Sequence, residues 1–486
     1  MINQSNLKKL QNLLKEKDID IFVINRSDEY LNEYISPNAE RLNFITNFSG
    51  SAGRAIITPT DAFLYVDGRY TFQANTQINA KEIQAKHLNS FWTDLEKILL
   101  EKELKIALDP TLHSIIEIEK VEKMLENSTS QLQLIDKNFV DLIWENQPKT
   151  QYTDIFDHPT SFAGQGRSEK LDILKKFLDQ NEIDHYFVSG LDNIAWLLNL
   201  RADDIKYTPL LYSYLLISKN NKHSLYIKES AMPEILKKEI QTLININNIE
   251  NIRSIFNNIN SSESIGLDFN STTYYFLDLL RKQKISTKNL ANPCILLKAI
   301  KNETELDGAK KAHIRDGVSI TKYIYWLKNI MDPKSNDEIS VAHHLENLRR
   351  KNELFHSLSF DTISAIDKNA ALPHYRVTEE GKSSFSDNNI YLVDSGGQYF
   401  DGTTDITRTI ILGEATREQK DRFTRVLKGH IALSNHVFDK GTKGTDIDYL
   451  ARKSLQEINL DYDHGTGHGI GSFLSVHEGP QRIAKK

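Results

Sequence analysis

Two short segments late in the chain carry residue types that can bind metal ions. The first, residues 391–411, reads YLVDSGGQYFDGTTDITRTII and contains Asp394 and Asp405. An apolar strand is predicted to end at Asp394, and Thr407–Leu412 is predicted to form the returning strand, so the two carboxylates should lie close together. Paired carboxylates repel unless a cation separates them, and Mn²⁺ or Mg²⁺ suits such oxygen ligands. Asp is also common in turns and caps, so a purely structural role for Asp394, Asp401 and Asp405 stays open.

The second segment, residues 463–480, reads DHGTGHGIGSFLSVHEGP and contains His464, His468 and His477. Glycines alternate around His468, which lets the backbone and an imidazole approach a bound ion closely. A dinucleotide-binding loop is the alternative, but no apolar strand directly precedes the glycines and a histidine lies among them. A third candidate, His374 in the sequence ALPHY, is by itself more typical of a structural histidine.

Composition narrows the class of protein. The chain has 486 residues, of which 39% are hydrophobic and 26% charged, so we expect a globular α/β protein of about three domains. The net charge of −6 argues against nucleic acid as a partner. The single cysteine, Cys294, excludes an internal disulfide, and no apolar stretch is long enough for a membrane span. We therefore expect a cytoplasmic protein without a membrane partner.

The elements before these segments form a weak internal repeat. Residues 7–16 and 171–180 have helical periodicity, and each helix is followed by a predicted strand, at 19–23 and 183–188. The same number of residues separates Asp20 from Asp184 and Asp28 from Asp192. Two similar α/β domains would explain this pattern, and chance similarity of two helix–strand units is the alternative.

Two boundaries divide the chain. Residues 145–167 are polar, lack periodicity and contain two prolines and two glycines, which is typical of a linker. Asn302 with Glu305 forms a capping-box pattern that predicts the start of a long helix, with Ile320, Ile324 and Leu327 on one face. We expect domains at 1–148, 163–302 and 303–486.

The motifs together resemble a known family. In order, HY, DSGGQYFDGTTDITRT, HGTGHGIG and HEGP are similar to the catalytic domain of the long, three-domain Xaa-Pro aminopeptidases, which are pita-bread metallopeptidases. Residues 50–53 (GSAG) with 67–70 (DGRY) resemble their first domain, and residues 191–201 (LDNIAWLLNLR) resemble their second. The resemblance implies two creatinase-N-like α/β domains followed by a pita-bread catalytic domain.

The resemblance also implies roles for individual residues. Asp394 would bind one metal ion, Asp405 would bridge two, and His468 would bind the other. His374, His464 and His477 would contact the substrate or support the metal ligands around the scissile peptide. The family usually uses two Mn²⁺ ions, with Zn²⁺ in some members, and a metal-bound hydroxide as nucleophile. The implied reaction releases the N-terminal residue from a peptide whose second residue is proline.

The family pattern has two further glutamate ligands, which follow the HEGP segment by tens of residues. This chain ends at Lys486, shortly after Pro480, and Glu478 belongs to the HEGP motif itself. We therefore expect a catalytic domain that is C-terminally incomplete. Either the chain is a fragment of an active enzyme, which the intact remaining motifs favour, or it is a shortened form that no longer hydrolyses peptides.

Three functions remain in competition at this point. The first is an Xaa-Pro aminopeptidase, and the second is a non-catalytic module that binds peptides or proteins on the same fold. The third is a related enzyme, either a prolidase-type dipeptidase or a creatinase. Three-domain length and the DGTTDITRT sequence favour the aminopeptidase, while retention of Asp394, Asp405 and His468 argues against a pure binding module. The family resemblance further implies a homodimer.

Overall fold

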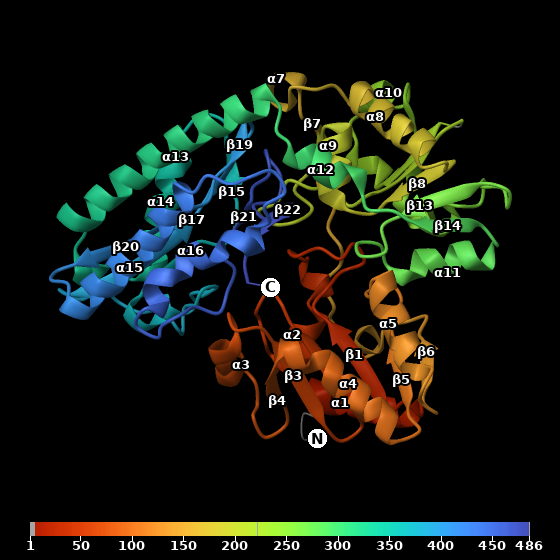
Figure 1. The fold of residues 1–486 in the computed structure, drawn as a ribbon, viewed down its shortest axis with the longest axis horizontal. Coiled ribbons are helices and arrows are strands. Elements are labelled where there is room, and N and C mark those ends of the chain that lie inside the picture. Colours follow the sequence, from red (N-terminus) through yellow and green to blue (C-terminus); the bar gives the residue numbers. More distant parts are fainter. Residues whose placement is uncertain (1–4, 221, 486) are drawn as a thin grey trace. The chain divides into compact units, whose positions relative to one another are not determined.

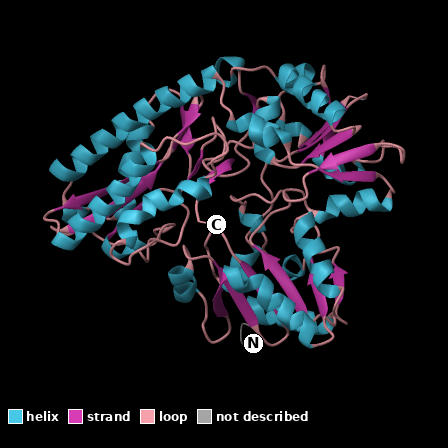
Figure 2. Cartoon of the chain, viewed as in Figure 1, coloured by secondary structure: helices cyan, strands magenta, loops and turns pink. Residues whose placement is uncertain are grey.

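The computed structural model describes residues 5–220 and 222–485, and the chain forms two compact units (Figure 1). The first unit comprises the residues up to His158 together with Gln165–Cys294. The second comprises Pro159–Gly164 and the residues from Ile295 onward. Both units combine helices and strands, as expected for an α/β protein (Figure 2). They alternate along most of the first unit, whereas in the second unit pairs of helices precede and follow a run of strands.

The first half of the first unit is built on a six-stranded mixed sheet. Its central strand, β1 (Ile21–Asn25), pairs antiparallel with β2 (Arg54–Ile57) and parallel with β5 (Lys105–Leu108). In spatial order the strands are β4 (Gln84–His87), β3 (Ala62–Val66), β2 (Arg54–Ile57), β1 (Ile21–Asn25), β5 (Lys105–Leu108) and β6 (Gln131–Leu134). The helices are α1 (Asn6–Glu16), α2 (Arg41–Thr46), α3 (Thr71–Gln77), α4 (Phe91–Glu101), α5 (Ile115–Leu125) and α6 (Phe139–Ile143).

The second half of this unit repeats the same topology. Its strands, in spatial order, are β12 (Ile244–Asn248), β11 (His223–Ile227), β10 (Tyr214–Ser218), β8 (His185–Val188), β13 (Ser264–Leu267) and β14 (Ser286–Asn289). Its helices are α8 (Arg167–Gln180), α9 (Leu191–Leu198), α10 (Glu234–Ile240) and α11 (Tyr274–Lys282), and a short strand pair joins β7 (Phe156–Asp157) to β9 (Leu200–Arg201). The central strand β8 again pairs antiparallel with β10 and parallel with β13.

The predicted repeat is thus confirmed, and its first pair of aspartates, Asp20 and Asp184, has one structural role. Asp20 accepts a hydrogen bond from the backbone N–H of Lys105 at 2.8 Å, at the start of β5. Asp184 accepts the equivalent bond from the N–H of Ser264 at 2.9 Å, at the start of β13. Each aspartate joins the end of a helix–strand connection to the neighbouring parallel strand.

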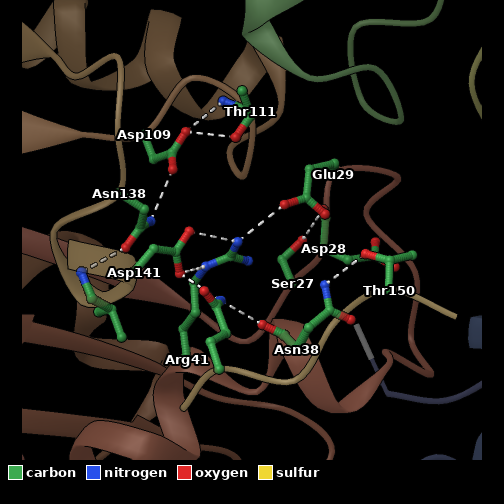
Figure 3. Close-up of polar contacts among 12 residues, drawn as sticks. Ser27, Asp28, Glu29, Asn38, Arg41, Asp109, Thr111, Asn138, Asp141 and Thr150 are labelled. Carbon is green, nitrogen blue, oxygen red and sulfur yellow. Dashed lines mark hydrogen bonds and ion pairs between the residues drawn. The ribbon is translucent and has the colours of Figure 1, made fainter. Parts of the chain in front are cut away.

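A polar network stabilises the connections in the first half of this unit (Figure 3). The Arg41 guanidinium donates from Nε to Asp141 Oδ1 at 2.7 Å and from Nη2 to Glu29 at 3.1 Å. Asn138 donates to Asp109 at 2.8 Å, which joins the start of α6 to the end of β5. Each of these side chains has at least one partner within the first half of the unit, so we interpret the network as structural.

The second unit contains two three-stranded sheets, a two-stranded sheet and four longer helices. The sheets are β16 (Ile363–Ile366), β17 (Asn389–Ser395) and β20 (Ile406–Leu412); β15 (Phe355–Leu358), β18 (Gly397–Tyr399) and β19 (Gly402–Thr403); and β21 (Gly467–Gly469) with β22 (Glu478–Ile483). The helices are α13 (Glu303–Asn329), α14 (Glu338–Arg349), α15 (Arg417–Ser434) and α16 (Gly444–Gln456), with a short α7 (Thr160–Ala163). Helix α12 (Pro293–Ala299) begins in the first unit and ends in the second.

Helix α13 begins where the capping-box pattern predicts. Asn302 accepts from the N–H of Glu305, and the Glu305 side chain accepts from the N–H of Asn302. Ile320 and Leu327 are buried against α14, β17 and β20, and Ile324 packs beside them. This apolar face fixes the long helix on the sheet that carries the candidate site.

Candidate metal centre

Strands β17 and β20 bring the two predicted carboxylates together. They pair antiparallel, with Ser395 opposite Ile406 and Asp394 opposite Thr407. Asp394 therefore lies near the end of one strand, while Asp405 directly precedes the other. The negative charge of Asp405 is close enough to raise the pKa of Asp394, so the expected juxtaposition of the two aspartates is confirmed.

The connection between these strands turns back on itself through β18 and β19, and its close packing depends on glycine. A Cβ atom at Gly396 would lie 1.8 Å from the carbonyl oxygen of Thr404, a distance that no side chain can occupy. The N–H of Thr404 donates to the carbonyl of Gly397 at 2.9 Å, which closes the turn. The DSGG sequence thus lets the two halves of the hairpin approach closely and sets the spacing of the two aspartates.

The electrostatics of Asp394 favour a bound cation. Its Oδ1 atom is buried and has no hydrogen-bond partner among the described residues. Burial first, and then the charge of Asp405, raise the pKa of Asp394 to about 6. A divalent cation between the two carboxylates would supply the missing partner for Oδ1 and remove the repulsion.

The predicted histidine ligand lies beside this pair. His468 Nε2 is 3.4 Å from Asp405 Oδ2, and His468 Nδ1 donates to the carbonyl of Gly469 at 2.8 Å. Because the carbonyl can only accept, Nδ1 carries the proton, and in the neutral ring the lone pair of Nε2 faces the carboxylate. A lone pair and a carboxylate oxygen at that separation suit a shared cation.

His477 also belongs to this group. Its ring meets the ring of His468 edge to face, with centroids 4.4 Å apart and planes at 86°. Strand β21 carries His468 and pairs with β22, which begins directly after His477, so the strand pair holds the two rings together.

The other two predicted histidines have different surroundings. His464 is exposed, lies with its ring 4.6 Å from the ring of Tyr462, and directs Nδ1 to the carbonyl of Gly465 at 2.7 Å. His374 is half-buried in the segment that follows the short helical turn at Asp367–Ala371. Their roles at the site stay predictions.

The residues present fit a divalent metal, although the arrangement is not closed. Within residues 5–220 and 222–485, no three His, Cys, Asp or Glu side chains converge closely enough to form a ready-made ion site. Instead, Asp394 interacts with Asp405, and Asp405 in turn lies next to His468. Two carboxylates and one imidazole form a donor set that hard divalent cations accept, and one carboxylate oxygen, Asp394 Oδ1, is buried without a hydrogen-bond partner among the described residues.

Sequence reasoning missed several residues around this site. Thr407 contacts the Asp394 carboxyl and opposes the rise in its pKa. Glu478 is fully buried and accepts hydrogen bonds from Lys298, at 2.8 Å, and from Lys301. Thr407 lies within the quoted motif and could have been found from its place opposite Asp394, but no spacing rule connects Lys298 and Lys301 to Glu478.

Comparisons with known proteins agree with this architecture. Residues 6–137 and 146–305 each match the creatinase/prolidase N-terminal domain family, and residues 307–486 match metallopeptidase family M24. A probable Xaa-Pro aminopeptidase P of Paracoccidioides brasiliensis is 37% identical over 503 residues, covering 99% of this chain and 80% of that protein. One of Neosartorya fischeri is 39% identical over 498 residues, covering 99% of this chain and 75% of that protein.

A solved structure is similar over the same range. The X-prolyl aminopeptidase of Caenorhabditis elegans, described as a cytosolic enzyme with a di-nuclear active site, superposes with a TM-score of 0.93 at 30% identity. The match covers 99% of this chain and 81% of that one. The expected fold, two creatinase-type domains followed by a pita-bread domain, is thereby confirmed, and the chain belongs to the Xaa-Pro aminopeptidase P family within the M24 metallopeptidases.

Proposed function

We propose that this chain is a metal-dependent aminopeptidase that releases the N-terminal residue from peptides with proline in the second position. The observation that carries the proposal is the buried Asp394 oxygen, which has no hydrogen-bond partner in the part of the chain that the structure describes and lies next to Asp405 and His468. Family membership supplies the reaction class, and the retained ligand residues support catalysis over a purely binding role.

Asp394, Asp405 and His468 would hold the metal, with Asp405 placed between the other two. We propose two Mn²⁺ ions, with Zn²⁺ as the alternative, in line with the di-nuclear site of the Caenorhabditis elegans relative. When bound, the metal supplies Lewis-acid polarisation of the scissile carbonyl and a water of lowered pKa.

The side chains around the metal ligands would orient the peptide. We propose that His477, whose ring contacts His468, would donate a hydrogen bond to the carbonyl oxygen as negative charge develops there. His464 and His374 are proposed to contact the substrate on either side of the scissile bond. The Nδ1 bond of His468 to Gly469 fixes the ring, and Nε2 lies 3.4 Å from Asp405 Oδ2, which supports its proposed role as a metal ligand.

Domain boundaries, location and assembly are part of the same proposal. We propose domains at 1–148, 163–302 and 303–486, a cytoplasmic location and a homodimer. The cytosolic description of the Caenorhabditis elegans relative supports the location. None of the helices that the structure describes combines the length and the apolar character that crossing a bilayer requires.

Release of free alanine from Ala-Pro-Ala and Ala-Ala-Ala by the 486-residue chain tests the function. The assay is run with added Mn²⁺, with Zn²⁺ and with a chelator. We expect chelator-sensitive cleavage of the proline peptide only. The dipeptide Ala-Pro is measured in parallel, and its cleavage without cleavage of Ala-Pro-Ala would indicate a dipeptidase instead. Specific peptide binding without cleavage would indicate the binding module.

A further inference from the structure

A buried ion pair lies beneath the hairpin that carries the two aspartates. Arg349, at the end of α14, donates from Nε to Asp316 Oδ1 at 2.6 Å and from Nη2 to Oδ2 at 3.1 Å. Both side chains are completely inaccessible to solvent. Asp316 lies on the buried face of α13, one turn before Ile320. The pair therefore joins the two helices that cover this sheet.

Each member of the pair also binds a residue adjacent to a proposed metal ligand. Asp316 Oδ2 accepts from the hydroxyl of Thr404 at 2.7 Å, and Thr404 directly precedes Asp405. Arg349 Nη2 donates to the hydroxyl of Ser395 at 3.0 Å, and Ser395 directly follows Asp394. The same ion pair thus contacts both sides of the hairpin.

Thr404 is the most constrained point of this arrangement. Its hydroxyl donates to Asp316 and accepts from the N–H of Gly397 at 2.9 Å. Its N–H donates to the carbonyl of Gly397 at 2.9 Å, and its carbonyl accepts from the hydroxyl of Ser359 at 2.8 Å. With all of its polar groups engaged, Thr404 has little freedom, and the position of Asp405 follows from it.

We propose that Asp316 and Arg349 are positioning residues that set the separation of Asp394 and Asp405 through Thr404 and Ser395. The inference rests on the proposed metal site. A buried ion pair adds little net stability compared with a well-packed apolar pair, so a stability role alone does not account for this one. The geometry of the ion pair does account for its presence, because metal binding requires that the ligand carboxylates keep a fixed separation.

Substitutions at Thr404 test the link without breaking the ion pair. Thr404→Val keeps the side-chain shape but removes the hydroxyl, whereas Thr404→Ser keeps the hydroxyl. We expect Thr404→Val to raise the Mn²⁺ dissociation constant at least about tenfold by calorimetry, while Thr404→Ser stays within a factor of about three. The kcat for Ala-Pro-Ala should fall more than KM changes. Ser395→Ala, which removes the contact to Arg349, should act in the same direction.

Asp141→Asn is the matched control, because it weakens another Arg–Asp contact, with Arg41 in the first unit. It should lower the melting temperature without changing Mn²⁺ binding. Equal Mn²⁺ affinities for Thr404→Val, Thr404→Ser and the parent chain would overturn the positioning role.

Hydrogen exchange of the metal-free chain separates this inference from the proposed function. We expect faster exchange of the amides at 394–406 in Thr404→Val than in Thr404→Ser. The two variants are compared under conditions that give them the same free energy of unfolding. If the parent chain binds no Mn²⁺, the proposed function fails, and the exchange result still decides the positioning claim. Unchanged exchange in Thr404→Val would contradict it.

Discussion

Asp316 and Asp394 are two acids of the same unit with opposite surroundings. Asp316 is fully buried, and its carboxylate accepts from Arg349, Tyr399 and Thr404. Asp394 is half-buried, and its Oδ1 has no hydrogen-bond partner among the described residues. Arg349 neutralises the charge of the Asp316 carboxylate, whereas the Asp394 carboxylate keeps one oxygen without a hydrogen-bond partner among the described residues. Asp316 is therefore satisfied by the fold, whereas Asp394 is the acid that we propose as a metal ligand.

The largest effect that this comparison predicts is on activity. Asp405→Asn removes the negative charge shared between the proposed ligands, so cleavage of Ala-Pro-Ala should fall about 10³-fold or more in kcat/KM. Circular dichroism and the unfolding midpoint should change little. Asp439→Asn, at an exposed aspartate of the same unit, is the control and should retain activity.

The largest effect on stability should come from removing the cationic partner of Asp316. Arg349→Met leaves the Asp316 carboxylate buried without its cation, which should cost about 3–5 kcal/mol in the free energy of unfolding. Chemical denaturation measures this change. Arg350→Met, at the next position, removes only a half-exposed contact with Glu346 and should cost less than about 1 kcal/mol. Equal losses in the two variants would refute the contrast.

A substitution at Asp394 should stabilise the metal-free chain, whereas Arg349→Met destabilises it. The pKa of Asp394, about 6 in the folded chain, lies above its ordinary value of 3.8. The folded state therefore holds this proton longer than the unfolded state, and the metal-free chain loses stability as pH rises from about 4 to about 6. Asp394→Asn should abolish that loss and raise stability at pH 7 by about 1–2 kcal/mol, as measured by denaturation at several pH values. A lower stability of this variant at pH 7 would mean that the carboxylate is already satisfied.

The smallest effect concerns one hydrogen bond that the Asp316 carboxylate accepts. Tyr399 donates to Asp316 Oδ1 at 3.1 Å, and burial raises the pKa of this tyrosine, so it stays protonated. Tyr399→Phe should cost about 1–2 kcal/mol of unfolding free energy. Tyr325→Phe, at an exposed tyrosine of α13, should have no measurable effect.

The sequence allowed much of this to be predicted, because the informative signals are local. Strand periodicity and turn glycines place Asp394 and Asp405 on one hairpin, and the capping box at Asn302 marks the start of α13. The repeat of Asp20 at Asp184 reflects a shared hydrogen bond between a connection and its neighbouring strand.

The rest depends on contacts that have no fixed spacing in the chain. Asp316 meets Arg349 and Thr404 only after two helices and the hairpin have packed, and Glu478 meets Lys298 in the same way. A signal for Asp316 did exist, since an acid one turn before Ile320 on the apolar face of a helix needs a buried partner. The sequence does not say which cation supplies it.

Calorimetric titration of the metal-free chain with Mn²⁺ tests the central claim most directly, with Asp405→Asn and Asp439→Asn measured beside the parent. The account predicts saturable binding to the parent chain and to Asp439→Asn, and loss of that binding in Asp405→Asn. Equal Mn²⁺ affinity of Asp405→Asn and the parent would contradict it, because the metal would then lie elsewhere than between Asp394, Asp405 and His468.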